Sequence, residues 1–189
     1  MASTVQICNL ALSRVGGARI TSLSDGTQES NLCNTLFNDV VEEVMSEGDW
    51  ATATFRATLN ATTNTPAFGF TTEFQLPTDP KCLKVLEVNE DLTGHHDYRI
   101  ESDKLLANIT SIKIKYIGLE TDTSKFGPGL KRAIVSRLAA DLAYPLTGSA
   151  NVAESLYRRY LKELAEALAS DGQQGSDQCI DSQDIDEVR

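Results

Sequence analysis

Long apolar runs and closely spaced cysteines are missing from this chain of 189 residues. No run approaches the roughly 20 apolar residues that cross a bilayer, and residues 1–6 lack the basic and then apolar pattern of a signal peptide. We therefore expect synthesis in a cytoplasm and no contact with a membrane. The four cysteines, Cys8, Cys33, Cys82 and Cys179, lie far apart, which excludes a CxxC metal or redox motif. They are typical of small buried side chains in a reducing compartment.

Histidine is nearly absent, and the sequence contains no GxSxG, phosphate-binding loop, HExxH or GxGxxG motif. The two histidines, His95 and His96, are adjacent and precede a carboxylate. We interpret them as the polar tip of a hairpin rather than as metal ligands. Asp39 or Glu42 with Glu43 has the composition of a glycosidase carboxylate pair, but the solvated outer face of a helix explains them better. We expect no catalytic residue, no metal and no cofactor.

Basic residues are outnumbered, since 17 Lys and Arg stand against 27 Asp and Glu and the formal net charge is −10. The DNA backbone repels such a chain, and specific DNA-binding proteins usually carry a basic patch. The composition therefore argues against a repressor or a nuclease. It remains compatible with a channel that DNA passes through without sticking.

Two amphipathic helices are predicted in the first 50 residues. The first runs from about residue 4 to 15, where Ser3 and Gln6 form a capping-box pair and Gly16 provides the C-terminal stop. The second runs from about residue 28 to 47 and ends at Gly48, with pairs of apolar residues repeating every four positions. Residues 50–59 are interpreted as a bridge from these helices to a sheet.

An antiparallel β region is predicted over residues 62–120, where threonine, proline and period-two alternation appear. Residues 68–74 and 83–88 are predicted strands, and the second of them contains one step out of phase. Residues 98–107 favour a hairpin that turns at Ser102 and Asp103. Residues 111–119 alternate apolar side chains with lysines, which is typical of a half-exposed antiparallel strand.

Two further helices are predicted after the β region. The third begins near Pro128, which suits a first helical position because it lacks an amide proton, and Pro145 is expected to end it. The fourth starts after Asn151, which forms a second capping-box pair with Glu154. The basic residues of the stretch 158–162 are expected to lie on a solvated face of this helix.

The last segment, residues 171–189, is acidic and too poor in apolar residues to fold alone. Its spaced apolar residues Ile180, Ile185 and Val188 are candidate anchors on a partner surface. The order of elements predicts an α+β fold: mainly an α-helical bundle of two N-terminal and two C-terminal helices, with an inserted antiparallel β module and an extended C-terminal tail. The predicted ranges are 1–61 and 121–170 for the bundle, 62–120 for the module and 171–189 for the tail. The predicted bundle core comprises Leu12, Leu36, Val40, Val44, Ile134, Leu138, Leu161 and Leu164.

Short motifs in a fixed order resemble the head-to-tail adaptor family of podoviruses, also called the tail tubular protein A family. Together they cover most of residues 5–168. In the N-terminal third they are Ile7-Cys8-Asn9-Leu10-Ala11-Leu12, Val15-Gly16, Ile20-Thr21-Ser22-Leu23, Asp25-Gly26-Thr27, Cys33, Phe37, Asp49-Trp50-Ala51 and Arg56-Ala57-Thr58-Leu59. Further along they are Tyr98-Arg99-Ile100, Lys104-Leu105-Leu106, Ile114-Lys115-Tyr116-Ile117, Leu138-Ala139, Leu142-Ala143 and the stretch from Tyr157 to Ala167.

The resemblance implies a structural virion protein without enzymatic activity. Such adaptors form a homo-oligomeric ring, dodecameric in this family, which joins the portal protein to the tail nozzle protein. The ring extends the DNA channel for genome retention and ejection, and DNA passes it without specific binding. The expected location is the head–tail interface of the virion, after synthesis and assembly in the host cytoplasm. Residues 171–189 are then expected to dock on the portal through Ile180, Ile185 and Val188.

Three other functions remain open from the residues alone. One is a cell-wall glycosidase carried in the tail, and another is a connector or completion protein of a long-tailed phage. A host-directed inhibitor that binds one bacterial protein is the third. A carboxylate needed for lysis of peptidoglycan would identify the first, and the native mass of an assembled ring would separate the second.

Overall fold

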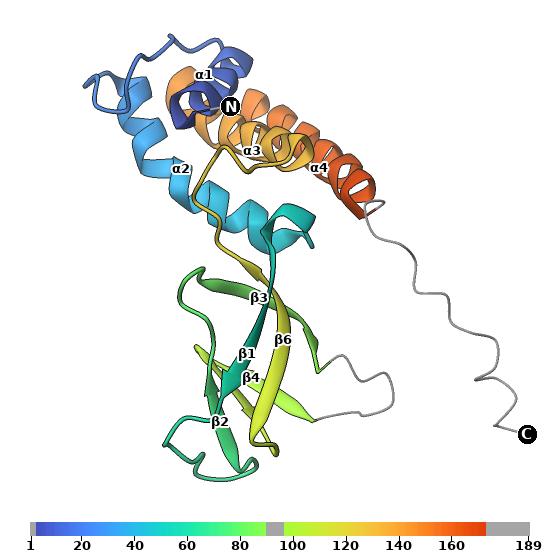
Figure 1. Cartoon of the computed structure of the whole chain (residues 1–189). Helices are drawn as coiled ribbons and strands as arrows, with labels where there is room; N and C mark the ends of the chain where they lie inside the picture. The colour runs from blue at the N-terminus through green and yellow to red at the C-terminus, as the bar shows by residue number, and fades with distance from the viewer. Residues whose placement is uncertain (1–2, 90–96, 173–189) are drawn as a thin grey trace, which may run out of the picture.

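The structure is a computed structural model that describes residues 3–89 and 97–172. Four helices form a bundle above a β module, as Figure 1 shows. The helices are α1 (Thr4–Val15), α2 (Gln28–Glu47), α3 (Pro128–Thr147) and α4 (Ala150–Gly172). The predicted α+β class is confirmed. None of these helices has the length and apolar character of a membrane span in the described part of the chain.

Local capping explains where the first two helices begin. The Ser3 Oγ accepts a hydrogen bond from the Gln6 amide at 3.3 Å, and the Thr27 Oγ1 accepts one from the Ser30 amide at 3.2 Å, so each hydroxyl satisfies an amide without a helical partner. Gly16 ends α1 in the left-handed conformation with φ of 82°, which favours glycine. The predicted ranges of α1 and α2 are confirmed.

The ends of the C-terminal helices differ from the prediction. Pro145 lies inside α3, which continues to Thr147 and is capped by Gly148 with φ of 66°. A proline near a helix end removes one amide donor, and the remaining residues can keep helical dihedrals until the next glycine. Ser149, not Asn151, caps α4, because its Oγ accepts from the Val152 amide at 3.4 Å.

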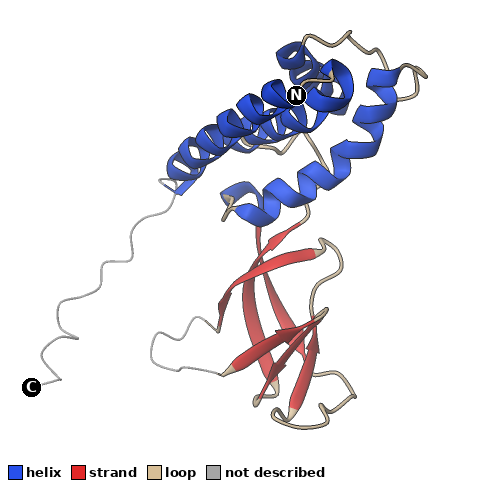
Figure 2. Cartoon of the chain, turned by 180° about the vertical axis from the view of Figure 1, so that it is seen from behind, coloured by secondary structure: helices blue, strands red, loops and turns tan. Residues whose placement is uncertain are grey.

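Helix α3 is the centre of the bundle. It packs along α4, and α1 and α2 each pack against it. Ten of its residues are buried, so it is apolar on more than one face, as a helix surrounded by others must be. The first core comprises residues from α1, α2, α3 and α4 together with Trp50, Ile117 and Phe126. Both views show the helices gathered at one end of the molecule (Figures 1 and 2).

The β module consists of two three-stranded antiparallel sheets and a second, smaller core. One sheet has the order β1 (Thr54–Asn60), β6 (Ser111–Gly118) and β3 (Cys82–Val88). The other has the order β2 (Thr72–Gln75), β5 (Lys104–Ala107) and β4 (Tyr98–Glu101). The predicted hairpin over 98–107 and the last strand are confirmed. Figure 2 shows the strands below the helices.

Two expectations in the β region were wrong. Residues 54–60, taken as part of a bridge inside the bundle range, form β1, which pairs with β6 from Thr54 opposite Ile117 to Asn60 opposite Ser111. A short 3₁₀ turn, Ala51–Ala53, precedes β1. Residues 68–71 are not strand, and β2 contains only the last part of the predicted segment. Their apolar alternation comes from two loop aromatics, Phe68, which is 89% exposed, and Phe70, which is half-buried.

The predicted bundle core is largely correct. Leu12, Val40, Val44, Ile134 and Leu138 are buried, and Leu36 and Leu164 are partly buried against the same core. Leu161 is a wrong prediction, since its side chain is 48% exposed. The neighbouring Tyr160 faces inward instead, and residues one position apart on a helix point about 100° apart. Cys8 and Cys33 are buried and free as expected, and Cys82 is half-buried. Cys179 lies outside the described residues.

Candidate functional site

The carboxylates that resemble a glycosidase pair take part in ion pairs that hold the fold together. The Glu42 Oε1 lies 2.5 Å from the Lys81 Nζ, which links α2 to the start of β3. The Glu43 Oε2 lies 3.0 Å from an Nη of Arg137, which links α2 to α3. Among the described residues, no three His, Cys, Asp or Glu side chains are grouped so as to hold a metal ion. The histidine pair lies outside these residues.

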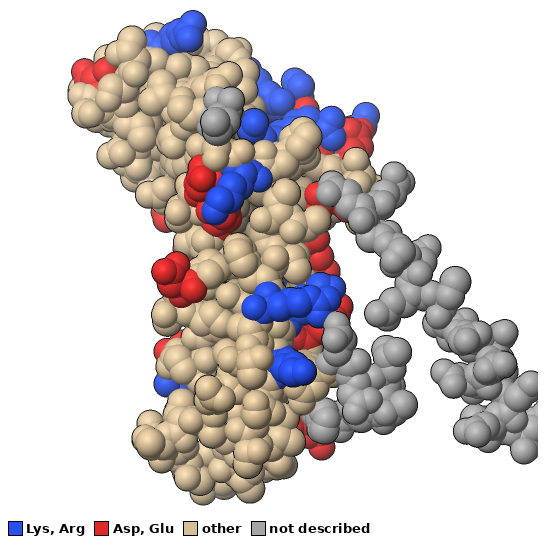
Figure 3. Space-filling model, viewed as in Figure 1, with Lys and Arg blue, Asp and Glu red and all other residues tan. Residues whose placement is uncertain are grey.

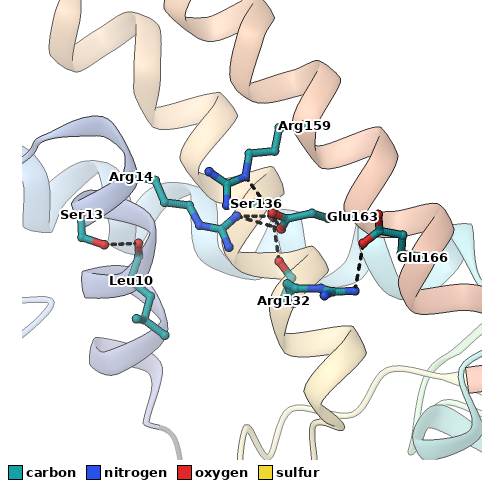
Figure 4. Close-up of polar contacts among 8 residues, drawn as sticks. All are labelled: Leu10, Ser13, Arg14, Arg132, Ser136, Arg159, Glu163 and Glu166. Carbon is teal, nitrogen blue, oxygen red and sulfur yellow. Dashed lines mark hydrogen bonds and ion pairs between the residues drawn. The ribbon is translucent and has the colours of Figure 1, made fainter. Parts of the chain in front are cut away.

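A polar cluster joins α1, α3 and α4. Arg14 of α1 reaches across to Glu163 of α4 at 3.0 Å and to the buried Ser136 of α3, as Figure 4 shows. Ser136 donates to the same carboxylate, and Arg159 binds its other oxygen at 2.7 Å. Burial alone would raise the pKa of Glu163, but the hydrogen bonds from Ser136, Arg159 and Arg14 outweigh it and lower the pKa to about 2. Glu163 is therefore a charged, fully partnered group whose role is structural.

A second polar cluster joins α2, α3 and α4. The Arg137 guanidinium lies 3.0 Å from Glu43 and 3.4 Å from Asp141, and its centre lies 5.3 Å from the ring of Tyr157 and 5.7 Å from that of Tyr160. These distances are in the range of cation–π contacts. One guanidinium thus neutralises two carboxylates and covers two aromatic rings.

Burial dominates the titration of this second cluster. It raises the pKa of Asp141, which the charge of Glu43 raises further and Arg137 opposes. Burial also raises the pKa of Tyr160, whose hydroxyl donates a hydrogen bond to Glu47. Tyr160 is therefore a neutral hydrogen-bond donor at all physiological pH values. Both clusters pair their charges internally, which suits helix packing better than proton transfer.

An open groove of about 310 Å³ lies beside the first cluster, between α1 and the start of α3. All three charged residues on its rim are basic, in a chain whose net charge is −10. Val135 is buried and Leu10 is 45% exposed, so the groove also offers apolar surface. Figure 4 shows Leu10 and Arg14 on α1 beside Arg132 on α3. The lining residues are Leu10, Ser13, Arg14, Pro128, Lys131, Arg132 and Val135. This groove is suited to an acidic, partly apolar peptide.

Besides Leu10 at the groove, the large exposed apolar side chains of the described residues lie in two regions. On the α3–α4 hairpin they are Tyr144, Val152, Tyr157 and Leu161, between 38% and 61% exposed. In the β module Phe68 is 89% exposed, and Tyr98 and Ile100 on the edge strand β4 are each 42% exposed. The loop that carries Phe68 lies at the end of the module remote from the helices (Figure 1). Large exposed apolar patches mark interaction surfaces in many proteins.

Charge is unevenly distributed over the surface. On the face shown in Figure 3, Lys and Arg gather over the α3–α4 end of the bundle, and smaller mixed groups lie over the β module. In the predicted basic stretch, Arg158 pairs with Glu154 and Arg159 with Glu163. These pairs occupy both arginines of the stretch, and the exposed Lys162 is its remaining basic residue.

The junction between bundle and module, which the sequence predicted only as a bridge over residues 50–59, is built around a buried tryptophan. Trp50 is fully buried there, and its Nε1 donates to the Val44 carbonyl at 2.9 Å. The Ala51 amide donates to the Asp171 carboxylate at 2.6 Å, so Asp171 belongs to α4 and not to the tail in which it was placed. The single tryptophan of the chain beside Gly48 was the available signal. The predicted anchors Ile180, Ile185 and Val188 lie outside the described residues.

Comparison with protein-family models finds no match to this chain, and comparison with curated proteins finds no similar protein either.

Proposed function

We propose that this chain is a structural virion protein: the subunit of a head-to-tail adaptor ring that joins the portal protein to the tail nozzle protein. The observation that carries the proposal is the pair of exposed apolar surfaces at opposite ends of a two-part body, one on the α3–α4 hairpin and one at the Phe68 end of the module. The motifs that resemble the podoviral adaptor family support the same conclusion.

A ring of identical subunits needs heterologous contacts, in which one surface of a subunit meets a different surface of its neighbour. The α3–α4 hairpin offers such a surface, because Tyr157 and Leu161 lie one turn apart on its outer face. The β module, bound to the bundle through Trp50 and the ion pair of Lys84 with Asp49 at 2.7 Å, then faces the nozzle or the neighbouring subunit. The tail, with Ile180, Ile185 and Val188, docks on the portal.

The acidic composition fits a channel. DNA that moves through the ring meets mostly negative surface, which disfavours sticking. The ion pairs of Arg137, Arg158 and Arg159 are made within the subunit, so these three cations are less available to bind phosphate. The ring extends the portal channel for genome retention and ejection, and the protein is located at the head–tail interface of the virion.

Native mass spectrometry tests the proposal. The purified protein is mixed with portal rings of the phage that encodes it, and the expected product is one portal ring plus twelve subunits of 20.6 kDa each. A double variant Tyr157→Ser and Leu161→Ser is expected to reduce ring closure, whereas Lys113→Ser, on the exposed side of β6, is the matched control. If only unbound monomer remains beside the portal ring, the adaptor function is wrong.

A further inference from the structure

The groove between α1 and the start of α3 has a rim that is not fully neutralised by the fold. Lys131 forms no ion pair with another described residue, and Arg132 meets Glu166 only at 3.7 Å, with side chains 45% and 51% exposed. Arg14 is held by Glu163 and Ser136. A carboxylate entering the groove would therefore gain two basic partners, Lys131 and Arg132, and a third cation close by.

The C-terminal end of α4 lies next to this groove. A Cβ placed on Gly129, in the first turn of α3, would lie 3.3 Å from the Cβ of Ala167, so α4 crosses the start of α3 there. Helix α4 ends at Gly172, five residues later, which is about 7.5 Å of helix. Residues 173–189 therefore begin within a short distance of the groove. Seventeen residues span up to about 56 Å when extended, which is far more than they need to reach it.

The chemistry of residues 173–189 matches the groove. Five acids stand against a single base, Arg189, and three apolar residues are spaced among them. Acids can meet Lys131 and Arg132 while an isoleucine contacts Leu10 and Val135. The acids are Asp177, Asp181, Asp184, Asp186 and Glu187, and the apolar residues are Ile180, Ile185 and Val188. Because the segment is tethered, its effective concentration at the groove is in the millimolar range, so even weak docking is populated.

We propose that residues 173–189 dock in cis on the groove formed by Leu10, Lys131, Arg132 and Val135 of the same chain. The docked segment shields its own apolar residues until a competing partner surface displaces it. Contacts of this kind, between exposed charges and a few apolar groups, are weak and sensitive to salt. This inference does not rest on the proposed function, because it concerns the isolated chain.

Zero-length carbodiimide cross-linking of the full chain, followed by peptide mass spectrometry, tests the contact. We expect amide links from Lys131 to acids of residues 173–189, with a yield that falls several-fold between about 0.1 M and about 1 M salt, as the Debye length falls from about 10 Å to about 3 Å. The variant Lys131→Glu should remove these links and lower the yield of any other cross-links to residues 173–189. The matched control Lys113→Glu, on the β module, should leave the Lys131 links unchanged.

Two further measurements make the result decisive. The full-length variant with Ile180→Ser, Ile185→Ser and Val188→Ser leaves every described residue of the bundle core unchanged, and it should shift the NMR methyl signals of Leu10 and Val135 if the segment covers them. Unchanged signals, or links that avoid Lys131, would overturn the proposal. A mixture of isotopically heavy and light chains separates the two possible sources of the segment. Links within one isotopic form support docking in cis. Links between heavy and light chains would mean that the groove binds residues 173–189 of a second copy.

Discussion

The bundle and the β module are built on separate cores that differ in size and in origin. The bundle core gathers 24 buried residues around α3, whereas the module core contains eight. The helices present apolar residues to the core at a spacing set by local sequence, whereas most strands of the module pair with partners distant in the chain. The exception is the local hairpin of β4 and β5. The comparison predicts that the bundle keeps its structure when the module core is disrupted. The module, in contrast, buries part of its apolar surface against the bundle.

Strand β6 shows how the two cores meet. Ile112, Ile114 and Tyr116 face the module core, while Ile117 belongs to the bundle core. Side chains alternate between the two faces of a strand, so the two faces of one strand serve two cores. In β3, Leu83 and Leu86 pack on the bundle whereas Val85 and Val88 pack on the module. The junction is thus formed by strands β3 and β6, which contribute side chains to both cores, and not by a flexible linker.

The largest effect should come from Phe74→Ala, which removes a fully buried ring from the small core. We expect a loss of about 3–5 kcal/mol, the usual cost of truncating a buried phenylalanine. Hydrogen exchange should show faster exchange of amides in strands β2, β4 and β5 and in the half of β6 that begins at Ser111. Amides of α3 should keep their protection. The matched control Phe68→Ala, at a side chain 89% exposed, should change stability by less than about 0.5 kcal/mol.

Equal loss of protection in α3 and in the strands would show that the two cores unfold as one unit. That outcome would contradict the independence of the bundle and assign the stability of the whole chain to the shared layer at β6 and β3. Loss of protection confined to the strands would support the independence of the bundle.

The sequence predicts the bundle better than the module for a physical reason. Helix periodicity and caps such as Ser3, Thr27 and Gly16 are local, so the ranges of α1 and α2 could be read from the chain alone. Strand β1 does alternate, since Phe55, Ala57 and Leu59 point to the module core. That signal is weak because the inward-facing Ala57 is a residue type depleted in strands, and the pairing with β6 is what makes the segment a strand.

Other features depend on contacts that no local pattern encodes. The out-of-phase step in residues 83–88 is real, because the pairing of β3 with β6 shifts register between Val85 and Glu87. A bulge of this kind changes which residues face the core. The choice between Tyr160 and Leu161 depends on Glu47 and Arg137, which lie on other helices. The groove was missed because its lining comes from α1 and α3, more than 100 residues apart.

A second prediction concerns the bundle and compares a buried leucine with an exposed one. Leu138→Ala, at a fully buried position of α3, should cost about 2–5 kcal/mol. Leu161→Ala, 48% exposed on α4, should cost less than about 0.5 kcal/mol. Urea unfolding followed by circular dichroism at the helical signal measures both. A similar, large loss at Leu161 would show that this side chain is covered in solution, as an interface between copies of the chain would require.

The smallest of the three expected effects is a loss of stability in acid. The experiment compares a buried ion pair with an exposed one. Glu163 is 12% exposed and bridges α1, α3 and α4, whereas the ion pair of Arg99 with Glu101 in the module is largely exposed. The pKa of Glu163 is lowered from 4.5 to about 2. Its contribution is therefore complete above pH 4.5 and is lost as the pH falls towards 2.

The variant Glu163→Gln tests this contribution, because glutamine keeps the shape but cannot titrate. Between pH 5 and pH 2 the native chain should lose on the order of 2–3 kcal/mol more than the variant, measured by urea unfolding at each pH. Glu166→Gln, at a carboxylate 51% exposed on the same helix, is the control and should change stability by less than about 0.5 kcal/mol. Parallel pH profiles for the native chain and Glu163→Gln would mean that Arg14 and Ser136 do not hold this carboxylate in solution. The carboxylate of Glu163 would then contribute nothing to the pH dependence of the stability of the bundle.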